Sequence, residues 1–410
     1  MLTLDKFEEA SEKVKEVTTE TKLVYSDYFS QQTGNKVYLK PENMQFTGAY
    51  KVRGAYYKIS TLTEEERAKG LITASAGNHA QGVAYAAKCY GCKAVIVMPT
   101  TTPLIKVNRT KSYGAEVVLY GDVYDEACQK AYELAEKEGY TFIHPFDDLA
   151  VATGQGTIAM QIFIELPLVE YILVPIGGGG LASGIGSFYK QMSPKTKIIG
   201  VEPAGAAGMK KSFECGEVTE LNEVDKFVDG AAVQRVGELT YAICKKVLDD
   251  IVVVPEGKIC TTILNLYNFD AIVVEPAGAL SMSALDFYKN EIKGKNVVCV
   301  VSGSNNDITR MEDIKERSLL YEGLKHYFVV RFPQRAGALQ SFVSNVLGPH
   351  DDITYFEYKK KTNREKGPAL IGIEIQHPED FQGLLDRMKS EGILYEYLND
   401  NPNLFEFLIG

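Results

Sequence analysis

Eight short apolar runs alternate with segments of helical periodicity between residues 70 and 305, and this alternation constrains the fold more than any other feature of the chain. Several runs are continuously apolar, as strands are when helices cover both faces of a sheet. The pattern predicts an α/β fold with parallel strands. So many strands favour more than one sheet, with a ligand bound between them. The runs are "LITAS", "KAVIVMP", "EVVLYG", "TFIHP", "EYILVPI", "KIIGVEP", "DIVVVPE" and "NVVCVVSG".

The length and charge of the chain limit its partners. Its 410 residues suffice for two or three domains with a large core. The formal net charge of -10 argues against a nucleic-acid partner, because phosphate contacts need a basic face. No apolar run approaches the roughly 20 residues that span a bilayer. The acidic, amphipathic start "MLTLDKFEEASEKVKEV" has no apolar signal core, so we expect a cytoplasmic protein without a membrane partner.

Seven scattered cysteines, an odd number, indicate a reducing compartment rather than a disulfide framework. Cys89 and Cys92 form a CxxC pair. A redox pair needs a helix N-terminus, and a zinc site needs a second ligand pair nearby. Here the pair follows a predicted helix, Gly91 is the expected C-terminal cap, and no second pair stands close by. We therefore predict that these thiols are structural.

The pattern changes after residue 320 to the order β-α-β-β-α-β of a ferredoxin-like domain. We therefore divide the chain into a catalytic domain of two α/β lobes, residues 1–320, and a small α+β domain, residues 321–410. The basic run Lys359–Lys361 is interpreted as part of a solvated hairpin turn. The small domain contains no catalytic constellation, which favours a regulatory role. Its first helix is expected to bury one face, made of Leu339, Phe342, Val343, Val346 and Leu347.

Three polar or glycine-rich motifs follow predicted strands: "SAGN", "GGGG" and "SGSNND". Open parallel sheets bind ligands at the carboxyl ends of their strands. In the segment "MQFTGAYKVRGAYYKIS", Lys51 begins an amphipathic helix. Such a lysine is often a surface residue whose stem packs on apolar neighbours. The alternative is a desolvated amine that attacks a carbonyl and forms a Schiff base.

The segment "ASAGNHAQG" places Asn78 and His79 at the start of a helix, where backbone N–H groups can hold a carboxylate or phosphate. No nucleophile motif accompanies His79, which favours a hydrogen-bonding role over a general base. Ser302 ends a buried strand. A hydroxyl at such a position is usually a satisfied core group.

The run "VPIGGGGLASG" opens a helix after a strand. Gly177, Gly179 and Ala182 fit the dinucleotide pattern G-x-G-x-x-A, and Glu202 ends the next strand. Three observations argue against a dinucleotide-binding site: the four successive glycines, the position of the motif in mid-chain and the lack of evident hydride chemistry. A P-loop is excluded because no GK[ST] follows. The four glycines favour a site where several N–H groups surround one phosphate.

In order and spacing, "TGAYKVRGA", "SAGNHAQG", "GGGGL", "VEPAGA" and "SGSNND" resemble the pyridoxal-phosphate enzymes of the tryptophan-synthase-β type, and more narrowly the threonine dehydratases. The resemblance covers nearly the whole chain. The last part, with "FPQRAGALQSF", is similar to the single ACT-like regulatory domain of the short biosynthetic form. The resemblance implies pyridoxal-phosphate fold type II, with two parallel or mixed sheets flanked by helices and the cofactor between them.

The resemblance also implies roles for single residues. Lys51 would bind the cofactor covalently, Asn78 would hydrogen-bond its 3′-oxygen, and Ser302 would face its ring nitrogen. The phosphate would lie on Gly177, Gly178, Gly179, Gly180 and Leu181. The substrate carboxylate would dock at Ser75, Gly77 and His79.

Two positions depart from the family pattern. Relatives often have serine two residues before the lysine, where this chain has Ala49, so any contact from that position is in doubt. Some relatives bind a cation through a glutamate, a carbonyl and an aspartate. Glu202 and Ala206 match the first two ligands, but Gly208 stands at the aspartate's position, which weakens the expectation of a metal site.

The resemblance implies β-elimination of threonine to 2-oxobutanoate and ammonia, the first step of isoleucine biosynthesis, with isoleucine as effector near "PQRAGAL". It also implies a homo-oligomer, a dimer or tetramer. Three alternatives stay open. A related serine or threonine dehydratase or racemase would share the catalytic motifs, and a nicotinamide-dependent dehydrogenase would rest on the glycine pattern alone. An amino-acid sensor without catalysis would have no need of Lys51.

Overall fold

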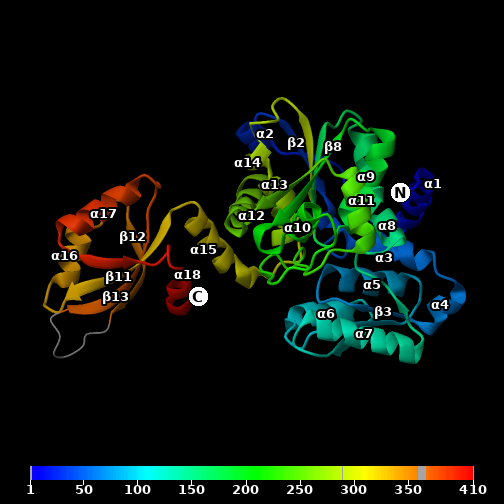
Figure 1. Cartoon of the computed structure of the whole chain (residues 1–410), viewed down its shortest axis with the longest axis horizontal. Coiled ribbons are helices and arrows are strands. Elements are labelled where there is room, and N and C mark those ends of the chain that lie inside the picture. Colours follow the sequence, from blue (N-terminus) through cyan, green and yellow to red (C-terminus); the bar gives the residue numbers. More distant parts are fainter. Residues whose placement is uncertain (1, 289, 359–365, 410) are drawn as a thin grey trace. The chain divides into compact units, whose positions relative to one another are not determined.

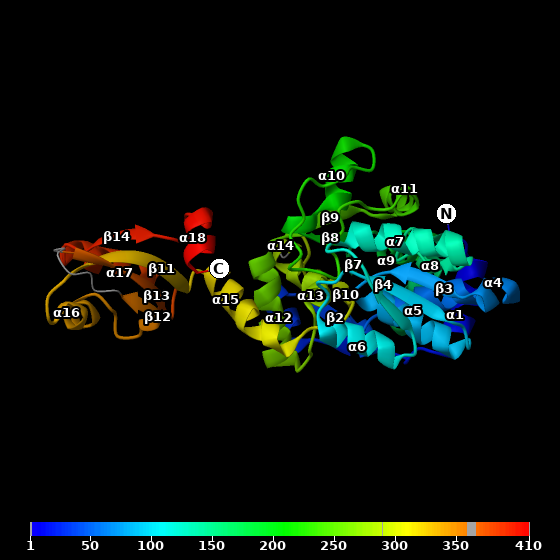
Figure 2. The same ribbon diagram turned by 90° about the horizontal axis from the view of Figure 1, so that it is seen from below.

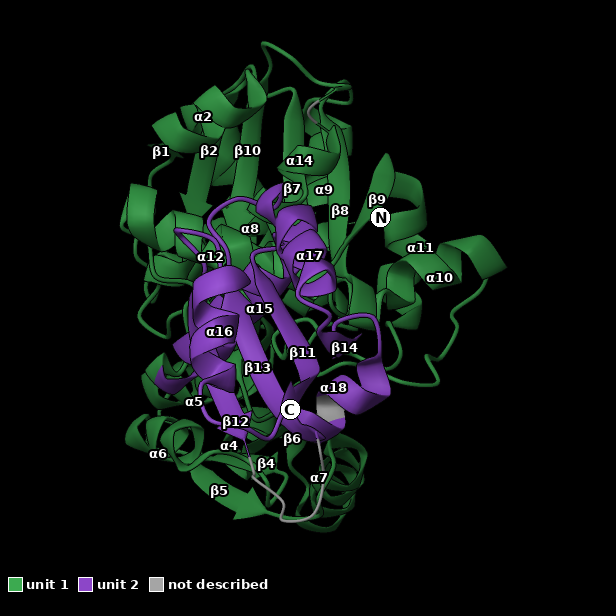
Figure 3. Cartoon of the chain, turned by 90° about the vertical axis from the view of Figure 1, so that its left-hand side faces the viewer, with its two compact units in different colours: residues 1–308 green, residues 309–410 purple. Residues whose placement is uncertain are grey.

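The computed structural model describes residues 2–288, 290–358 and 366–409. The chain forms two compact units, residues 1–308 and 309–410, coloured separately in Figure 3. Each unit has its own sheets and hydrophobic core. In the described part of the chain, no helix is both long and apolar enough to cross a membrane.

The first unit contains two sheets, as the number of apolar runs led us to expect (Figure 1). In the larger sheet, neighbouring strands are parallel except for β1, which pairs antiparallel with β2. All pairs in the smaller sheet are parallel. The larger sheet has the order β1 (Val24–Tyr25), β2 (Lys36–Pro41), β10 (Asn296–Val301), β7 (Tyr171–Pro175), β8 (Lys197–Pro203), β9 (Asp250–Val254). The smaller sheet has the order β5 (Glu116–Leu119), β4 (Ala94–Met98), β3 (Leu71–Ala74), β6 (Thr141–Phe142).

All eight predicted strands are confirmed, and the smaller sheet shows why their runs are continuously apolar. Ile96 in β4 belongs to the core cluster that contains Val83 of helix α5 (Asn78–Cys89), whereas its neighbour Val95 belongs to the cluster that contains Ala127 of helix α7 (Tyr124–Glu138). The two helices therefore cover opposite faces of the sheet, as Figure 2 shows. Both faces of the central strands β3 and β4 are buried, so alternation between apolar and polar residues is lost there.

The prediction missed β1 and β2. Strand β2 pairs with β10 along its whole length, from Lys36 opposite Asn296 to Pro41 opposite Val301. Its sequence "KVYLKP" contains two lysines and a proline, which are uncommon in a central strand. Lys40 is nevertheless fully buried, and its Nζ donates to the carbonyl oxygen of Thr21. The burial of this lysine is a tertiary effect that the local pattern does not reveal.

The helices of the first unit surround and connect the sheets. Helix α3 packs against α5, beside the smaller sheet, and against α8, beside the larger one. Helix α8 is apolar on most of its surface and also packs against α9 and α1. The helices are α1 (Leu4–Val14), α2 (Asp27–Thr33), α3 (Lys51–Ser60), α4 (Glu64–Lys69), α5 (Asn78–Cys89), α6 (Leu104–Ser112), α7 (Tyr124–Glu138), α8 (Leu149–Glu165), α9 (Gly180–Met192), α10 (Gly208–Cys215), α11 (Glu238–Val247), α12 (Glu256–Asp270), α13 (Pro276–Ser283) and α14 (Leu285–Tyr288), with short 3-10 turns at Glu42–Met44 and Ala204–Ala206. A further 3-10 turn, Ile308–Arg310, spans the boundary between the two units.

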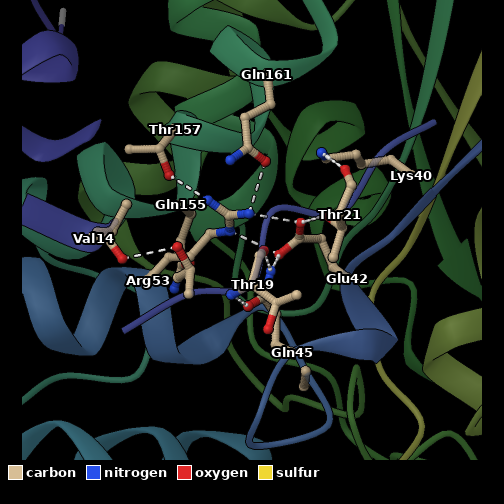
Figure 4. A network of polar contacts seen from close by, with 12 residues as sticks. Val14, Thr19, Thr21, Lys40, Glu42, Gln45, Arg53, Gln155, Thr157 and Gln161 are labelled. Atoms are coloured by element: carbon tan, nitrogen blue, oxygen red, sulfur yellow. Dashed lines mark hydrogen bonds and ion pairs between the residues drawn. The ribbon is translucent and has the colours of Figure 1, made fainter. Parts of the chain in front are cut away.

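A buried ion pair fixes α3 against its neighbours (Figure 4). Arg53 donates from Nε and Nη2 to the two carboxylate oxygens of Glu42, at 2.7 and 2.9 Å. Its guanidinium also donates to Thr157 and Gln161 of α8, while Thr21 donates to Glu42. Both charged side chains are fully buried, and each has several hydrogen-bond partners, as a buried pair needs.

The CxxC segment ends a helix, as predicted. Cys89 is the last residue of α5, and Gly91 adopts a positive φ of 65°. The N–H of Cys92 then donates to the carbonyl oxygen of Ala87, which closes the helix. Burial raises the pKa of both thiols, so the thiolate forms are disfavoured.

The second unit confirms the ferredoxin-like prediction. Its sheet has the order β12-β13-β11-β14 with all pairs antiparallel, and α18 follows the predicted elements. The predicted turn at Lys359–Lys361 lies outside the described residues. The elements are α15 (Met311–Tyr321), β11 (Lys325–Pro333), α16 (Ala338–Asn345), β12 (Asp352–Tyr358), β13 (Lys366–Glu374), α17 (Asp380–Ser390), β14 (Leu394–Tyr397) and α18 (Pro402–Leu408).

One detail of this unit differs from the prediction. Of the apolar face assigned to the helix after β11, Phe342 and Val346 are buried, whereas Leu339 and Val343 are 43% and 46% exposed. The sheet covers only one side of this short helix, so the apolar stripe is wider than the surface that buries it.

Candidate active site

The three predicted motifs lie at strand ends of the first unit: after β3, after β7 and after β10. Side-chain contacts bridge two of them. Asn305, beyond β10, donates through Nδ2 to Oδ1 of Asn78, at the start of α5. The Nδ2 of Asn78 in turn donates to Oε1 of Glu275 at 2.5 Å. The fold thus joins the smaller sheet to the larger one through polar groups at their carboxyl ends.

Lys51 is the first residue of α3, and its Nζ donates to the carbonyl oxygen of Pro145 at 2.8 Å. Desolvation lowers the pKa of this amine to about 8, and the nearby carboxylate of Glu275 acts in the opposite direction. The backbone N–H of Tyr50 donates to the carbonyl oxygen of Ser302 at 3.1 Å, so the end of β10 fixes the start of α3. A lysine held this way has the neutral amine fraction that attack on a carbonyl requires.

The glycine run forms the start of α9. Gly179 has a φ of 96°, which favours glycine, and Gly180 begins the helix. Within the described chain, the N–H groups of residues 177–181 donate no hydrogen bond. A Cβ at Gly178 would lie 2.1 Å from the ring of Phe146, and one at Gly177 would lie 3.1 Å from the backbone of Ala231. Free N–H groups at a helix N-terminus, on a loop that excludes side chains, fit a phosphate.

The contacts of Glu202 bear on whether the glycine run suits a dinucleotide or a single phosphate. Its two carboxylate oxygens accept from the N–H groups of Met209 and Lys210 at 2.7 and 2.8 Å, at the start of α10. The side chain is buried, and burial raises its pKa to about 7. Since these bonds direct the carboxylate to its own chain, it is unsuited to binding a ribose. This supports the single-phosphate interpretation of the loop.

No group of three or more His, Cys, Asp or Glu side chains is arranged to hold a metal ion among the described residues. Glu202 and Ala206, the weak candidates for cation ligands, are both buried. The carboxylate of Glu202 already accepts hydrogen bonds from the backbone of α10. The structure therefore adds no support for a cation at this position.

Glu275 is a residue of the site that sequence reasoning missed. It is 3% exposed, and burial raises its pKa to about 7, with the charge of Asp229 acting in the same direction. A Cβ at Gly303 would lie 2.2 Å from its Oε1, so glycine there makes room for the carboxyl. The hexapeptide "VEPAGA" occurs twice, at residues 201–206 and 274–279, and the second copy was the signal.

Ser302 and His79 occupy the strand and helix ends predicted for them. The Oγ of Ser302 donates to the carbonyl oxygen of Ala277 at 3.1 Å, so the hydroxyl is satisfied and buried. His79 Nε2 contacts the carbonyl oxygen of Ile143 at 2.9 Å, and desolvation lowers the pKa of the imidazole to about 3. His79 is therefore neutral at physiological pH, and it lacks the oriented carboxylate partner typical of a general base. At the same helix start, the N–H of Gly77 donates to Ser75 Oγ at 3.3 Å.

The segment "HPFDD", residues 144–148, is the second feature that sequence reasoning missed. Pro145 accepts from Lys51, and Phe146 packs on the glycine run. Asp147 and Asp148 accept hydrogen bonds from the first N–H groups of α11 and α8. Pro145 contributes a backbone carbonyl, and Phe146 contributes the packing of its ring. Neither contribution can be recognised from residue types alone, so the sequence did not reveal this segment.

Family models match both units. Residues 14–303 match the family described as "Pyridoxal-phosphate dependent enzyme", and residues 316–408 match "C-terminal regulatory domain of Threonine dehydratase". The two matches follow the division of the chain into its compact units.

Similar proteins span the whole chain. The biosynthetic L-threonine dehydratase IlvA of Halalkalibacterium halodurans is 53% identical over 404 residues, 98% of this chain and 97% of that protein. The protein of the same name from Bacillus subtilis is 51% identical over 404 residues, with 98% and 96% covered. The processed form of threonine deaminase isoform 2 from Solanum lycopersicum matches with a TM-score of 0.73 and 42% identity, over 77% of this chain and 94% of that one. Serine racemase of Dictyostelium discoideum matches with a TM-score of 0.71 and 32% identity, over 75% and 99%.

Proposed function

Because this chain belongs to the pyridoxal-phosphate-dependent enzymes and carries the C-terminal regulatory domain of the threonine dehydratases, we propose that it converts L-threonine to 2-oxobutanoate and ammonia. Pyridoxal phosphate is its cofactor. The observation that carries the proposal is the pairing of a desolvated lysine, Lys51, with a glycine run whose N–H groups are free to bind one phosphate.

The residues of the site fit this cofactor. In the proposal, residues 177–181 bind the phosphate, Lys51 holds the cofactor covalently, Asn78 donates to the 3′-oxygen, and Ser302 faces the ring nitrogen. The bound cofactor supplies an electron sink for the negative charge that develops at the substrate Cα. The residues of the protein have to bind and orient the cofactor and the substrate, and to move protons between them.

Lys51 is the proposed base. With cofactor and substrate bound, its Nζ would remove the proton from the substrate Cα. A pKa near 8 suits this task, because catalytic efficiency is highest when the pKa lies near the working pH.

The substrate carboxylate is proposed to dock at the start of α5, at Ser75, Gly77 and His79. Backbone N–H groups and the positive end of the helix favour an anion there. His79 contributes as a neutral residue, since its pKa is about 3. With so low a pKa the imidazole is a weak proton acceptor, so it does not compete with Lys51 for the role of base.

The second unit is the proposed site of control by isoleucine, the end product of the pathway that threonine dehydratase opens. The loop "PQRAGAL", residues 333–339, leads from β11 into α16 and is the proposed effector contact. Leu339 and Val343 are exposed apolar residues beside this loop, which supports pairing of these units in a homo-oligomer, a dimer or tetramer. We retain the proposed domains, 1–320 and 321–410, and a cytoplasmic location, which the seven free cysteines support.

The deciding experiment measures 2-oxo acid release from threonine and from serine, each with and without isoleucine. We expect preferential formation of 2-oxobutanoate and its suppression by isoleucine. Preference for serine, or racemisation without ammonia release, would instead favour the chemistry of the serine racemase relatives. Threonine turnover that is indifferent to isoleucine would refute this effector while leaving the lyase activity intact.

A further inference from the structure

The segment His144–Asp148 contacts four separate parts of the site. The carbonyl oxygen of Pro145 accepts from Lys51. The ring of Phe146 fills the space that a Cβ at Gly178 would need. Asp147 contacts the first turn of α11, and Asp148 contacts the first turn of α8. Phe146 touches the glycine run through its ring, and Asp147 is linked to the run through hydrogen bonds by way of α11.

Asp147 satisfies three successive N–H groups at the start of α11. Its Oδ1 accepts from Leu239 at 2.9 Å and from Thr240 at 3.1 Å, and its Oδ2 accepts from Glu238 at 3.1 Å. A carboxylate at a helix N-terminus is stabilised both by these bonds and by the helix dipole. A Cβ at Gly237 would lie 2.1 Å from Oδ1, so glycine at that position lets the carboxylate approach the helix.

The first turn of α11 in turn holds the glycine run. Thr240 Oγ1 donates to the carbonyl oxygen of Gly178 at 2.6 Å. Because the peptide unit is planar and trans, a carbonyl of Gly178 directed toward Thr240 makes the N–H of Gly179 point the opposite way. That N–H is one of the free donors of the phosphate-binding loop. The contact between Thr240 and Gly178 therefore sets the direction of a phosphate donor.

We propose that Asp147 is a positioning residue for the cofactor phosphate: it fixes the start of α11, so that Thr240 holds the Gly178 carbonyl and aims the N–H of Gly179. This inference rests on the proposed role of the glycine run. It assigns to Asp147 no contact with the cofactor or the substrate.

Asp148 provides a matched control on the adjacent residue. Its Oδ1 accepts from Ala150 and Val151 at 2.8 and 3.0 Å, at the start of α8, and its Oδ2 pairs with Lys58 at 2.7 Å. It is therefore also a helix-capping carboxylate, and its contacts lie on α8 and α3 rather than on α11. If loss of a helix cap alone weakened cofactor binding, replacement of either aspartate would do so. If the orientation of the Gly179 N–H matters, only replacement of Asp147 would weaken binding.

The experiment compares binding of pyridoxal phosphate and of pyridoxal, which lacks the phosphate, to the full-length apo-protein. Asp147→Ala is expected to weaken binding of pyridoxal phosphate about 10-fold, the effect of roughly one helix cap, and to change binding of pyridoxal less than about 2-fold. Thr240→Val removes the hydroxyl that holds Gly178 and should reproduce this phosphate-specific loss. Asp148→Ala should leave both affinities within about 2-fold while lowering the thermal stability.

The double variant Asp147→Ala/Thr240→Val should lose less than the product of the single effects, because both act through one contact. Equal losses for pyridoxal phosphate and pyridoxal, or equal losses in the Asp147 and Asp148 variants, would overturn the proposal in favour of a general effect on folding. The proposal would also be overturned if the parent protein binds pyridoxal phosphate and Asp147→Ala binds it with the same affinity. Failure of the parent protein itself to bind pyridoxal phosphate would refute the proposed function instead.

Discussion

The amine of Lys51 donates a hydrogen bond of 2.8 Å to the carbonyl oxygen of Pro145, and the next residue, Phe146, contacts the glycine run. This acceptor is neutral, so it orients the amine without the stabilisation of the ammonium form that a carboxylate would give. The depressed pKa of about 8 follows from desolvation in such a setting.

The first prediction concerns the pH dependence of cofactor capture by the apo-protein. Only the neutral amine attacks the aldehyde, so the rate should rise with pH and level off above about 8. Stopped-flow measurement of the visible absorbance that accompanies covalent binding would give this rate at each pH, and hence the pH at which the rate is half of its maximum, the midpoint. Lys51→Ala should show no covalent phase. A midpoint near the ordinary lysine pKa of 10.5 would contradict the burial of this amine.

The second prediction concerns Glu275, whose carboxylate raises the pKa of Lys51 against the larger effect of desolvation. Glu275→Gln removes that charge, so the midpoint of cofactor capture should move to lower pH. Glu202→Gln is a matched control, because Glu202 is also buried with a pKa of about 7, yet its oxygens are bound to the start of α10. Its midpoint should match that of the parent protein. A shift in the control, or none in Glu275→Gln, would refute this account.

The third prediction concerns the buried pair of Glu42 and Arg53. Glu42→Gln should lower the unfolding free energy of the first unit by about 3–5 kcal/mol, because it leaves a buried guanidinium without a counter-charge. The double replacement Glu42→Leu/Arg53→Met should cost less than the sum of the two single replacements. Urea unfolding monitored by circular dichroism would measure both. Additive losses would show that the two groups act independently.

The same pair gives a pH dependence of stability. Burial alone would raise the pKa of the Glu42 carboxyl, but the charge and hydrogen bonds of Arg53, together with Lys40 and Thr21, hold this pKa below its ordinary value of 4.5. The contribution of the pair is therefore complete above pH 4.5 and is lost as the pH falls through the lower, folded-state pKa. Glu42→Gln should lose this acid-sensitive part of the stability curve.

The fourth prediction concerns Ser302, which is buried and donates to the carbonyl oxygen of Ala277. A hydroxyl does not hold a facing ring nitrogen in its protonated form, whereas a carboxylate does. Ser302→Asp should therefore raise the share of side reactions relative to 2-oxobutanoate formation. Nuclear magnetic resonance in heavy water would separate hydrogen exchange at Cα from elimination, with Ser302→Ala as control. An unchanged product ratio in Ser302→Asp would count against the proposed role.

Strands buried on both faces, such as Ala94–Met98, could be predicted because their continuous apolar runs follow directly from that burial. Strand β2 escaped prediction because its lysines suggest a surface. Lys40 is buried only because the carbonyl oxygen of Thr21 accepts a hydrogen bond from its amine. The Oε1 of Glu165 lies 3.9 Å from the same Nζ. Partners distant in sequence leave no trace in the local pattern.

The site shows the same division. Lys51 and the glycine run could be selected from the sequence because their chemistry lies in residue type and order. Glu202 and Glu275 stand in identical hexapeptides, yet one caps α10 and the other contacts Asn78. Only the tertiary structure assigns them different tasks. The contribution of Pro145 is a backbone carbonyl, which every residue type possesses.

The adjacency of β2 and β10 also has a consequence for how the protein is made. Asn35 and Lys295 are hydrogen-bonded although they lie 260 residues apart, and a bridge joins Ala49 to Gly303 just before α3 begins. Contacts of such long range form late, since the intervening chain must first be ordered. During synthesis on the ribosome, Lys51 emerges early but gains its final support only after residue 303 has been added. A nascent chain therefore carries Lys51 for most of its translation without the contacts that hold the start of α3 in place.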